Sequence, residues 1–154
     1  MTEKAVSLLS GGMDSATVLA YSRSLSYDVT AITFDYGQRH RRELESSASL
    51  CRHYGVAQKV IKLDLRQIGG SSLTSEEKVS ERAFADIGRG IPDTYVPSRN
   101  IIFLSMAAAY AETINASTIF IGANSVDYSG YPDCRPEFFV AFQKALSLGT
   151  KIGT

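Results

Sequence analysis

The chain has 154 residues, which is enough for one domain with a single hydrophobic core. Apolar residues make up 44% of it, and no apolar run approaches the roughly 18 residues of a membrane span, so we expect a cytoplasmic protein without membrane attachment. Sixteen basic and sixteen acidic residues give a formal net charge of zero, which argues against nucleic-acid binding through bulk electrostatics.

The first half of the chain alternates apolar runs with helical segments. β-Branched and aromatic residues predict buried strands, and Gly55 is typical of a helix end. Asp14 or Ser15 is the expected N-cap of the first helix. The expected elements are a strand at 5–9, a helix at 14–25, a strand at 29–34, a helix at 41–54 and a strand at 60–63.

The second half begins with a segment dominated by glycine, serine and charged residues. We interpret it as a long loop, and such loops are typically lids, binding loops or disordered. The expected elements are this loop at 67–92 with a short helix at 80–84, an apolar helix at 98–114, a strand at 118–122, a polar stretch at 123–136 and an amphipathic helix at 137–148.

Strands that alternate with helices predict an α/β fold, a doubly wound and mostly parallel sheet with helices on both faces. Ligands of such sheets bind beyond the carboxyl ends of the strands. The polar and glycine-rich residues of this chain follow the predicted strands, so we expect them to gather at that edge and form a site there.

The sequence Ser10-Gly11-Gly12-Met13-Asp14-Ser15 lies between the first strand and the first helix. Glycines allow a tight turn, and free amides at a helix N-terminus favour a phosphate. The alternative is an ordinary strand–helix turn with a capping side chain. The segment lacks the Walker lysine. Asp14 either caps the helix or holds a magnesium ion that bridges to phosphates.

This six-residue segment resembles the SGGxDS signature of the PP-loop ATP pyrophosphatases, whose fold is the adenine nucleotide alpha hydrolase-like fold. The resemblance implies ATP cleavage between the α and β phosphates and adenylation of a substrate oxygen. The ATP-contacting residues that it implies are Leu8, Leu9, Ser10, Gly11, Gly12, Met13, Asp14, Ser15, Ala16, Thr17 and Val18.

Three further segments, at 34–40, 96–100 and 127–135, resemble the 7-cyano-7-deazaguanine synthases of queuosine and archaeosine biosynthesis. This resemblance covers essentially the whole chain and makes residues 1–154 a single PP-loop ATP-binding domain. The family is longer and ends in a cysteine cluster that binds zinc. That cluster would lie beyond Thr154, so Zn²⁺ has no expected ligand here, and we expect the chain to be a fragment or incomplete.

The family reaction converts 7-carboxy-7-deazaguanine, ammonia and ATP into the 7-nitrile by adenylating first the carboxylate and then the amide. This reaction depends on positioning of the reactants and stabilisation of the developing phosphate charge rather than on a covalent nucleophile. The resemblance makes Asp14, Ser15 and Arg99 the candidate catalytic residues, with Mg²⁺ held by Asp14 through the phosphates.

Several polar residues near the predicted strand ends are candidates for substrate binding. A tyrosine can stack on the deazapurine, and a carboxylate can accept its N–H groups; the alternative is a polar loop held by Gly130 and Pro132, or a solvated basic helix start at 38–42. The candidates are Arg39, His40, Asn100, Asp127, Tyr128, Tyr131, Asp133 and Arg135.

The remaining alternatives are another adenylating PP-loop enzyme, either amidating or tRNA-modifying, and a non-catalytic ATP-binding module. We expect small-molecule substrates, no nucleic-acid partner and a homodimer. Cys51, His53 and Cys134 are interpreted as core, surface and packed residues rather than as ligands.

Overall fold

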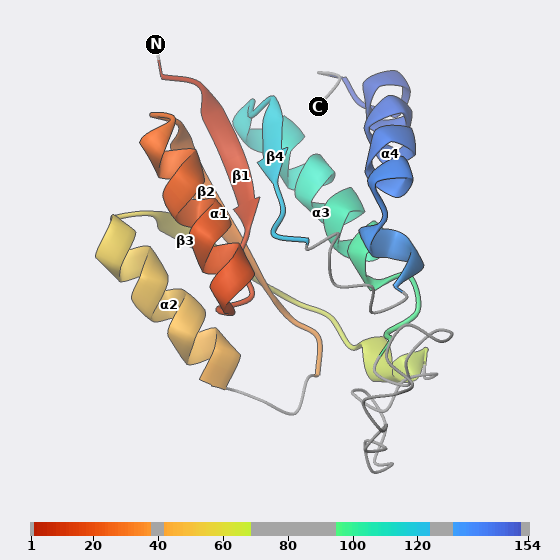
Figure 1. Cartoon of the computed structure of the whole chain (residues 1–154), viewed down its shortest axis with the longest axis horizontal. Helices are drawn as coiled ribbons and strands as arrows, with labels where there is room; N and C mark the ends of the chain where they lie inside the picture. The colour runs from red at the N-terminus through yellow and green to blue at the C-terminus, as the bar shows by residue number, and fades with distance from the viewer. Residues whose placement is uncertain (1, 38–41, 69–94, 124–130, 152–154) are drawn as a thin grey trace.

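The computed structural model of the protein describes residues 2–37, 42–68, 95–123 and 131–151. Within these ranges, β-strands and α-helices alternate in chain order, with two short 3₁₀ turns between them (Figure 1). The elements are β1 (Lys4–Leu8), α1 (Met13–Ser24), β2 (Asp28–Asp35), α2 (Arg42–Tyr54), β3 (Ala57–Lys62), η1 (Leu65–Gln67), α3 (Arg99–Ile114), β4 (Thr118–Phe120), η3 (Pro132–Cys134) and α4 (Pro136–Gly149).

The strands form a four-stranded parallel sheet in the order β3-β2-β1-β4. The central strand β1 pairs with β2 on one side, where Val6 lies opposite Thr30, and with β4 on the other, where Val6 lies opposite Ile119. The order reverses direction at β1, because the chain moves outward to β3 and then crosses back to β4. Such a switch point opens a crevice at the carboxyl ends of the strands.

Side-chain alternation along the strands builds two cores, one on each face of the sheet. Ala5 and Leu9 face α1 and α2, where they join Leu19 and Cys51. Val6 and Leu8 face α3, where they join Leu104, Ala107 and Ala111 among others. Helices therefore cover both faces, as the alternation of strands and helices predicted (Figure 1).

The element boundaries largely follow the sequence pattern, with three differences. The third strand begins at Ala57, before the apolar run, because it is an edge strand whose pairing with β2 does not depend on apolar residues. The fourth strand ends at Phe120, where its pairing with β1 stops. The N-cap of α1 is Gly12, and no side chain caps the helix, so the expected capping by Asp14 or Ser15 is wrong. Gly55 ends α2 with a φ of 61°, as expected.

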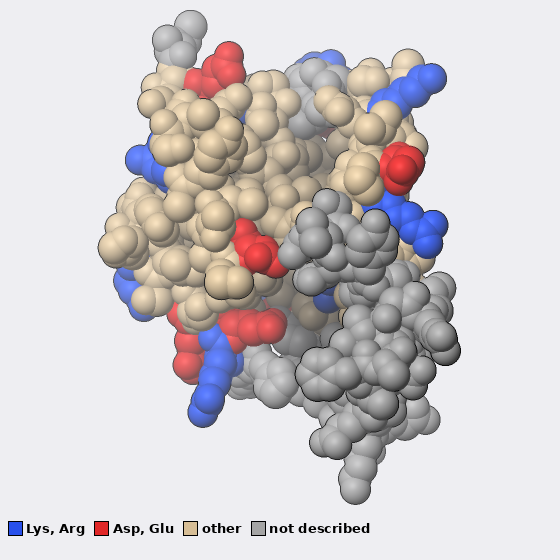
Figure 2. All heavy atoms as spheres, viewed as in Figure 1, with Lys and Arg blue, Asp and Glu red and all other residues tan. Residues whose placement is uncertain are grey.

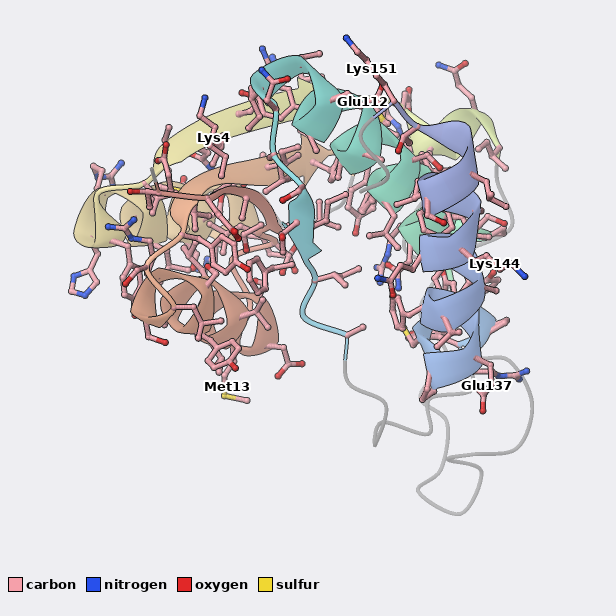
Figure 3. All side chains as sticks on the ribbon, turned by 90° about the horizontal axis from the view of Figure 1, so that it is seen from above. Lys4, Met13, Glu112, Glu137, Lys144 and Lys151 are labelled. Atoms are coloured by element: carbon pink, nitrogen blue, oxygen red, sulfur yellow. The ribbon has the colours of Figure 1, made fainter. Side chains whose placement is uncertain are left out.

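Helix α4 lies beside α3 and has no fully buried residue (Figure 1). Phe138, Phe139 and Phe142 contact the core on the α3 side, and the Lys151 amide donates to the Glu112 carboxylate beyond the end of the helix (Figure 3). On the face shown in Figure 2, acidic and basic side chains are interspersed, in keeping with the zero net charge. Among the described helices, none has the length and apolar character needed to cross a bilayer.

Candidate nucleotide-binding site

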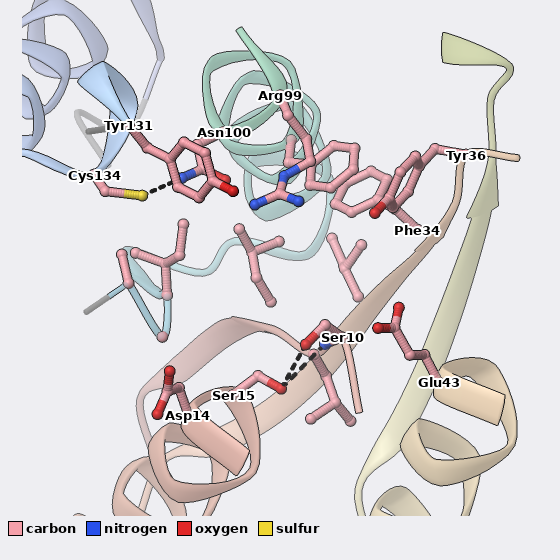
Figure 4. Close-up of a pocket in the computed structure, with 17 residues that line it drawn as sticks. Ser10, Asp14, Ser15, Phe34, Tyr36, Glu43, Arg99, Asn100, Tyr131 and Cys134 are labelled. Atoms are coloured by element: carbon pink, nitrogen blue, oxygen red, sulfur yellow. Dashed lines mark hydrogen bonds between the residues drawn. The ribbon is translucent and has the colours of Figure 1, made fainter. Parts of the chain in front are cut away.

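A cavity of about 480 Å³ opens at the carboxyl ends of β1, β2 and β4, and it extends to the first turn of α3 (Figure 4). Small-molecule sites typically occupy volumes of this size. The lining residues are Leu8, Leu9, Ser10, Asp14, Ser15, Ile32, Phe34, Tyr36, Glu43, Arg99, Asn100, Phe103, Ile121, Gly122, Ala123, Tyr131 and Cys134.

Residues 10–15, which we call the glycine loop, form one wall of the cavity. Gly11 has a φ of +93°, in the left-handed region that favours glycine. A Cβ at this position would lie 2.3 Å from the Glu43 carbonyl oxygen of α2. The Ser46 hydroxyl also donates to the Gly11 carbonyl at 2.8 Å. The first turns of α2 therefore pack against the glycine loop at Gly11.

Two hydroxyl groups link the ends of the glycine loop. The oxygens of Ser10 and Ser15 lie 3.0 Å apart, and Ser15 donates to the Gly12 carbonyl at 2.9 Å. The Ser10 amide donates to the Ser15 oxygen, and the Gly12 amide donates to the Ser10 oxygen, each at 3.2 Å. The loop is thus closed by its own side chains before any ligand binds.

The first turn of α1 presents backbone donors beside these hydroxyls. No hydrogen bond between described residues uses the amides of Met13, Asp14 or Ser15, while the next amide, of Ala16, donates to Gly12 at 3.0 Å. Three free amides and the positive end of the helix dipole favour an anion here. This arrangement is what a phosphate-binding turn requires.

Asp14 is exposed and lines the cavity from the first turn of α1. Its carboxylate forms no hydrogen bond or ion pair with any other described residue. The segment that follows β4 packs directly on the backbone of Asp14. A Cβ on Gly122 would lie 2.8 Å from the Asp14 carbonyl carbon. Only glycine allows β4 and α1 to approach this closely.

Arg99, Asn100, Tyr131 and Cys134 form the opposite wall, which we call the far wall (Figure 4). Arg99 is the first residue of α3, and its half-buried guanidinium points into the cavity. Within the described ranges, the one ion pair joins Asp64 to Arg66, so Arg99 carries a positive charge without a carboxylate partner there. A cationic wall thus faces the anion-binding turn.

Three hydrogen bonds and one ring contact hold the far wall. The Asn100 amide donates to the Asp133 carboxylate at 2.9 Å, and the Asn100 side chain donates to the Asp133 carbonyl at 3.0 Å and to the Cys134 sulfur at 3.3 Å. Asn100 and Asp133 are 7% and 5% exposed. The Tyr95 and Tyr131 rings stack with centroids 5.8 Å apart.

Aromatic residues line the cavity between the two walls. The rings of Phe34 and Phe103 stack with centroids 4.0 Å apart at 8°, and Tyr36 lies 5.4 Å from Phe103. Glu43 reaches the cavity from the first turn of α2. This part of the cavity offers flat apolar surface of the kind that binds a purine-like ring.

Of the predicted site residues that the structure describes, half line the cavity. Those that line it are Leu8, Leu9, Ser10, Asp14, Ser15, Arg99, Asn100 and Tyr131. Those that are described but do not line it are Gly11, Gly12, Met13, Ala16, Thr17, Val18, Asp133 and Arg135. Met13 is 81% exposed and points away from the fold (Figure 3). Arg39, His40, Asp127 and Tyr128 lie outside the described residues.

Sequence reasoning missed the apolar and long-range part of the lining. The missed residues are Ile32, Phe34, Tyr36, Glu43, Phe103, Ile121, Gly122, Ala123 and Cys134. The ends of β2 and β4 were already expected at this edge, so alternation along 29–34 identifies Ile32 and Phe34 as the face shared with Leu8. No local signal marks Glu43 or Gly122.

Three pKa shifts occur away from the cavity, two of them within one ion pair. Hydrogen bonds from Arg66, at 2.7 and 2.9 Å, lower the pKa of the Asp64 carboxyl, and the same pair raises the pKa of Arg66. Burial raises the pKa of the Cys51 thiol, against a smaller opposing effect of Arg52. Cys51 is therefore a core residue, as expected, and His53 lies on the surface.

A profile described as queuosine biosynthesis protein QueC matches residues 4–154. The chain belongs to the QueC family. It is 62% identical over 151 residues to the 7-cyano-7-deazaguanine synthase of Thermoplasma acidophilum, covering 98% of this chain and 63% of that protein. It is 54% identical to the synthase of Saccharophagus degradans, covering 98% of this chain and 66% of that protein. This QueC chain thus spans just under two thirds of the length of these relatives.

Solved structures support the fold of this QueC chain. An NH3-dependent NAD synthetase from Campylobacter jejuni aligns with a TM-score of 0.51 at 21% identity, over 99% of this chain and 54% of that one. A predicted subunit of tRNA methyltransferase from Methanocaldococcus jannaschii aligns with a TM-score of 0.56 at 17% identity, over 94% of this chain and 64% of that one. At these identities the likeness concerns the fold alone, and it agrees with the parallel α/β class expected from the sequence.

Proposed function

We propose that this chain is the ATP-binding part of a 7-cyano-7-deazaguanine synthase, an ATP-dependent carbon–nitrogen ligase. The enzyme would take 7-carboxy-7-deazaguanine and ammonia as substrates. ATP would adenylate the carboxylate with release of pyrophosphate, and ammonia would displace AMP to give the amide. A second adenylation, on the amide oxygen, would release pyrophosphate again and allow AMP to depart with that oxygen as the nitrile forms. The family and the identity of its curated relatives support this proposal.

The observation that carries the proposal is that two facing walls of the cavity both offer hydrogen-bond donors to a phosphate. The glycine loop offers three free amides and two hydroxyls to an anion, and the Arg99 guanidinium lies across the cavity from it. A transferring phosphoryl group needs donors on several of its oxygens as its charge develops. Ser15 and Arg99 would therefore contact the phosphate chain, and Arg99 would stabilise the departing pyrophosphate.

The donor set at Asp14 fits a magnesium ion. Mg²⁺ usually takes one or two carboxylates and completes its shell with water and substrate phosphates. The Asp14 carboxylate meets this requirement, because it is exposed at the cavity, has no other described partner and belongs to the same turn as the phosphate-binding amides. When bound, the ion would neutralise phosphate charge, and Asp14 would hold it in place.

The residues that recognise the deazaguanine remain proposals. Tyr131 lies on the far wall, where its ring can stack on a flat base. Arg39, His40, Asp127 and Tyr128 lie outside the described residues, and Arg135 is exposed at the N-cap of α4. Asn100 and Asp133 are buried and hydrogen-bonded to each other, which favours a different role for these two residues.

Four properties of the whole protein are part of the same proposal: a zinc site formed by cysteines beyond residue 154, a homodimer, small-molecule substrates without a nucleic-acid partner, and a cytoplasmic location. The apolar surface of α4 supports the dimer, because Val140 and Leu148 are 70% and 80% exposed. Sedimentation of the full-length protein with and without a zinc chelator tests the first two.

The reaction is tested with full-length protein, ATP, Mg²⁺, ammonium and 7-carboxy-7-deazaguanine, with AMP and nitrile followed by chromatography. We expect AMP and nitrile to appear together, with two AMP for each nitrile because both the acid and the amide are adenylated. AMP formation only with another acid would indicate another adenylating enzyme. ATP binding without AMP under every condition would refute a catalytic role.

Asp14→Ala is expected to abolish turnover and leave the fold intact. The matched control is Glu137→Ala, because Glu137 is also the second residue of a helix and is exposed. Both variants lose a favourable helix-dipole interaction of about 0.3–1 kcal/mol, which urea unfolding measures. Only Asp14→Ala should lose AMP formation. Wild-type turnover in Asp14→Ala would refute the role of this carboxylate.

A further inference from the structure

We infer that Asn100 and Asp133 are positioning residues that fix Arg99 and Tyr131 on the far wall of the cavity, and that they do not themselves bind substrate. The inference rests on the proposed function, because the groups being positioned are those that would contact ATP and its substrate. It follows from a set of hydrogen bonds between α3 and the 3₁₀ turn η3.

Helix α3 begins in an unusual way. Its N-cap, Ser98, has left-handed backbone angles (φ 55°, ψ 23°) and makes no side-chain capping bond. A left-handed serine costs free energy and persists only where its surroundings hold it. The Ser98 amide donates to the Tyr95 hydroxyl at 3.0 Å, which supports this conformation. The direction in which Arg99 leaves the helix depends on this turn.

The missing cap is supplied by a residue 33 positions later in the chain. The Asp133 carboxylate accepts the Asn100 amide at 2.9 Å, at a helix end where a negative charge is also favoured by the dipole. Asp133 is 5% exposed and does not line the cavity. A carboxylate that is buried and already bonded to a helix end is not available to a substrate.

The Asn100 side chain closes the same connection from the helix. Its amide nitrogen donates to the Asp133 carbonyl at 3.0 Å and to the Cys134 sulfur at 3.3 Å, so η3 is attached to α3 through both its backbone and its side chains. Tyr131, at the N-cap of η3, stacks on Tyr95, which in turn accepts the Ser98 amide. These contacts connect both chain neighbours of Arg99, Ser98 and Asn100, to η3 and Tyr131.

The Asn100–Asp133 pair therefore acts on the reaction through its neighbours. Arg99 and Tyr131 come from segments far apart in the sequence. The Asn100–Asp133 pair sets how they lie relative to each other on the far wall (Figure 4). Loss of the pair should leave both groups present but displaced, and a displacement of about 1 Å at a reacting group costs on the order of 100-fold in rate.

The test is a double-mutant cycle with Arg99, measured as AMP formation by full-length protein. Arg99→Ala and Asp133→Ala should each lower kcat on the order of 100-fold, with smaller changes in the KM for ATP. The double variant should be about as slow as Arg99→Ala alone, because Asp133 acts through Arg99. Additive losses of kcat, or a wild-type kcat in Asp133→Ala, would overturn the inference. A higher KM for the acid substrate is expected in Asp133→Ala as well, because the variant also displaces Tyr131.

Two further variants separate positioning from general destabilisation. Asp133→Asn keeps an oxygen that accepts the Asn100 amide and should stay within roughly fivefold of wild type. Asn100→Leu is matched by Gln58→Leu, because Gln58 also makes two side-chain bonds that are at least partly buried, to Thr33 at 2.8 Å and Ser47 at 3.0 Å, on the opposite face of the sheet. Equal loss of kcat in both leucine variants would mean that Asn100 has only a structural role.

A readout that does not depend on turnover separates this inference from the proposed function. Asp133→Ala should accelerate hydrogen exchange of the Asn100 amide while leaving that of Ala107, in the middle of α3, unchanged. If wild-type protein makes no AMP, the proposed function fails. The exchange measurement then still tests the contact between the Asn100 amide and the Asp133 carboxylate. Unchanged exchange at Asn100 would refute the connection.

Discussion

The glycine loop and the far wall face each other across one cavity, but they are held in different ways. The hydrogen bonds between hydroxyl groups and amides in the loop join residues two to five positions apart, whereas those of the far wall join residues 33 and 34 positions apart. The loop therefore takes its shape largely from its own six residues. The far wall exists only when two distant segments meet, so its geometry depends on the folded domain.

Gly11→Ala should have the largest effect on stability, because Gly11 is the loop residue against which the backbone of α2 packs. The new Cβ would lie 2.3 Å from the Glu43 carbonyl oxygen and 3.0 Å from the Ser47 amide, at a φ of +93°. We expect a loss of roughly 3 kcal/mol in the free energy of unfolding, measured by urea denaturation.

Gly12→Ala is the control for this prediction. Gly12 has a φ of −80°, and a Cβ there would meet only the Ser10 hydroxyl oxygen, at 3.5 Å. Its stability should stay within about 1 kcal/mol of wild type. If Gly11→Ala were as stable as Gly12→Ala, α2 would not support the loop as described.

Gly122→Ala should have the next largest effect, and it tests how the loop is placed relative to β4. Its Cβ would lie 2.8–2.9 Å from the backbone of Asp14 and Ser15, which cannot move without shifting the first turn of α1. Overpacking of this kind costs roughly 1–3 kcal/mol. ATP affinity, measured by calorimetry, should fall as well.

Gly149→Ala provides the comparison for Gly122→Ala, because a Cβ there meets nothing within 4 Å. Gly149 is the last residue of α4, so alanine should leave stability unchanged or raise it by up to about 1 kcal/mol. A Gly122→Ala variant with wild-type stability and ATP affinity would show that β4 does not fix the loop.

The sequence predicts the parts of this site that depend on local chemistry. The apolar run before Ser10, the glycine pair and the following helical segment place a phosphate-binding turn at the end of a buried strand, and the structure has that turn. The parallel sheet with helices on both faces was equally predictable, because alternation of strands and helices leaves few other arrangements.

The parts that were not predicted depend on contacts between distant residues. Phe34 and Phe103 stack although 69 positions separate them, and nothing local marks Gly122 as the neighbour of Asp14. The polar residues around Asp133 predict a substrate ligand, whereas its burial against α3 supports the positioning role that we infer. The N-cap was wrong for a related reason, since the Ser15 hydroxyl bonds within the loop instead of capping α1.

The smallest expected effect concerns the reactivity of the two cysteines at 51 and 134, which lie on opposite sides of the sheet. Cys51 lies in the core between the sheet and α2 at 4% exposure, and burial raises the pKa of its thiol. At pH 8 it therefore carries less thiolate than an ordinary cysteine, and thiolate is the reactive form. Cys134 is half-buried and lines the cavity on the far wall.

We expect iodoacetamide to modify Cys134 before Cys51, as followed by peptide mass spectrometry. ATP with Mg²⁺ should slow modification of Cys134 and leave Cys51 unaffected, because only Cys134 lies in the cavity that ATP would occupy. Equal rates at both thiols would contradict the burial of Cys51, whereas modification of Cys134 that ATP does not affect would place the nucleotide away from the far wall.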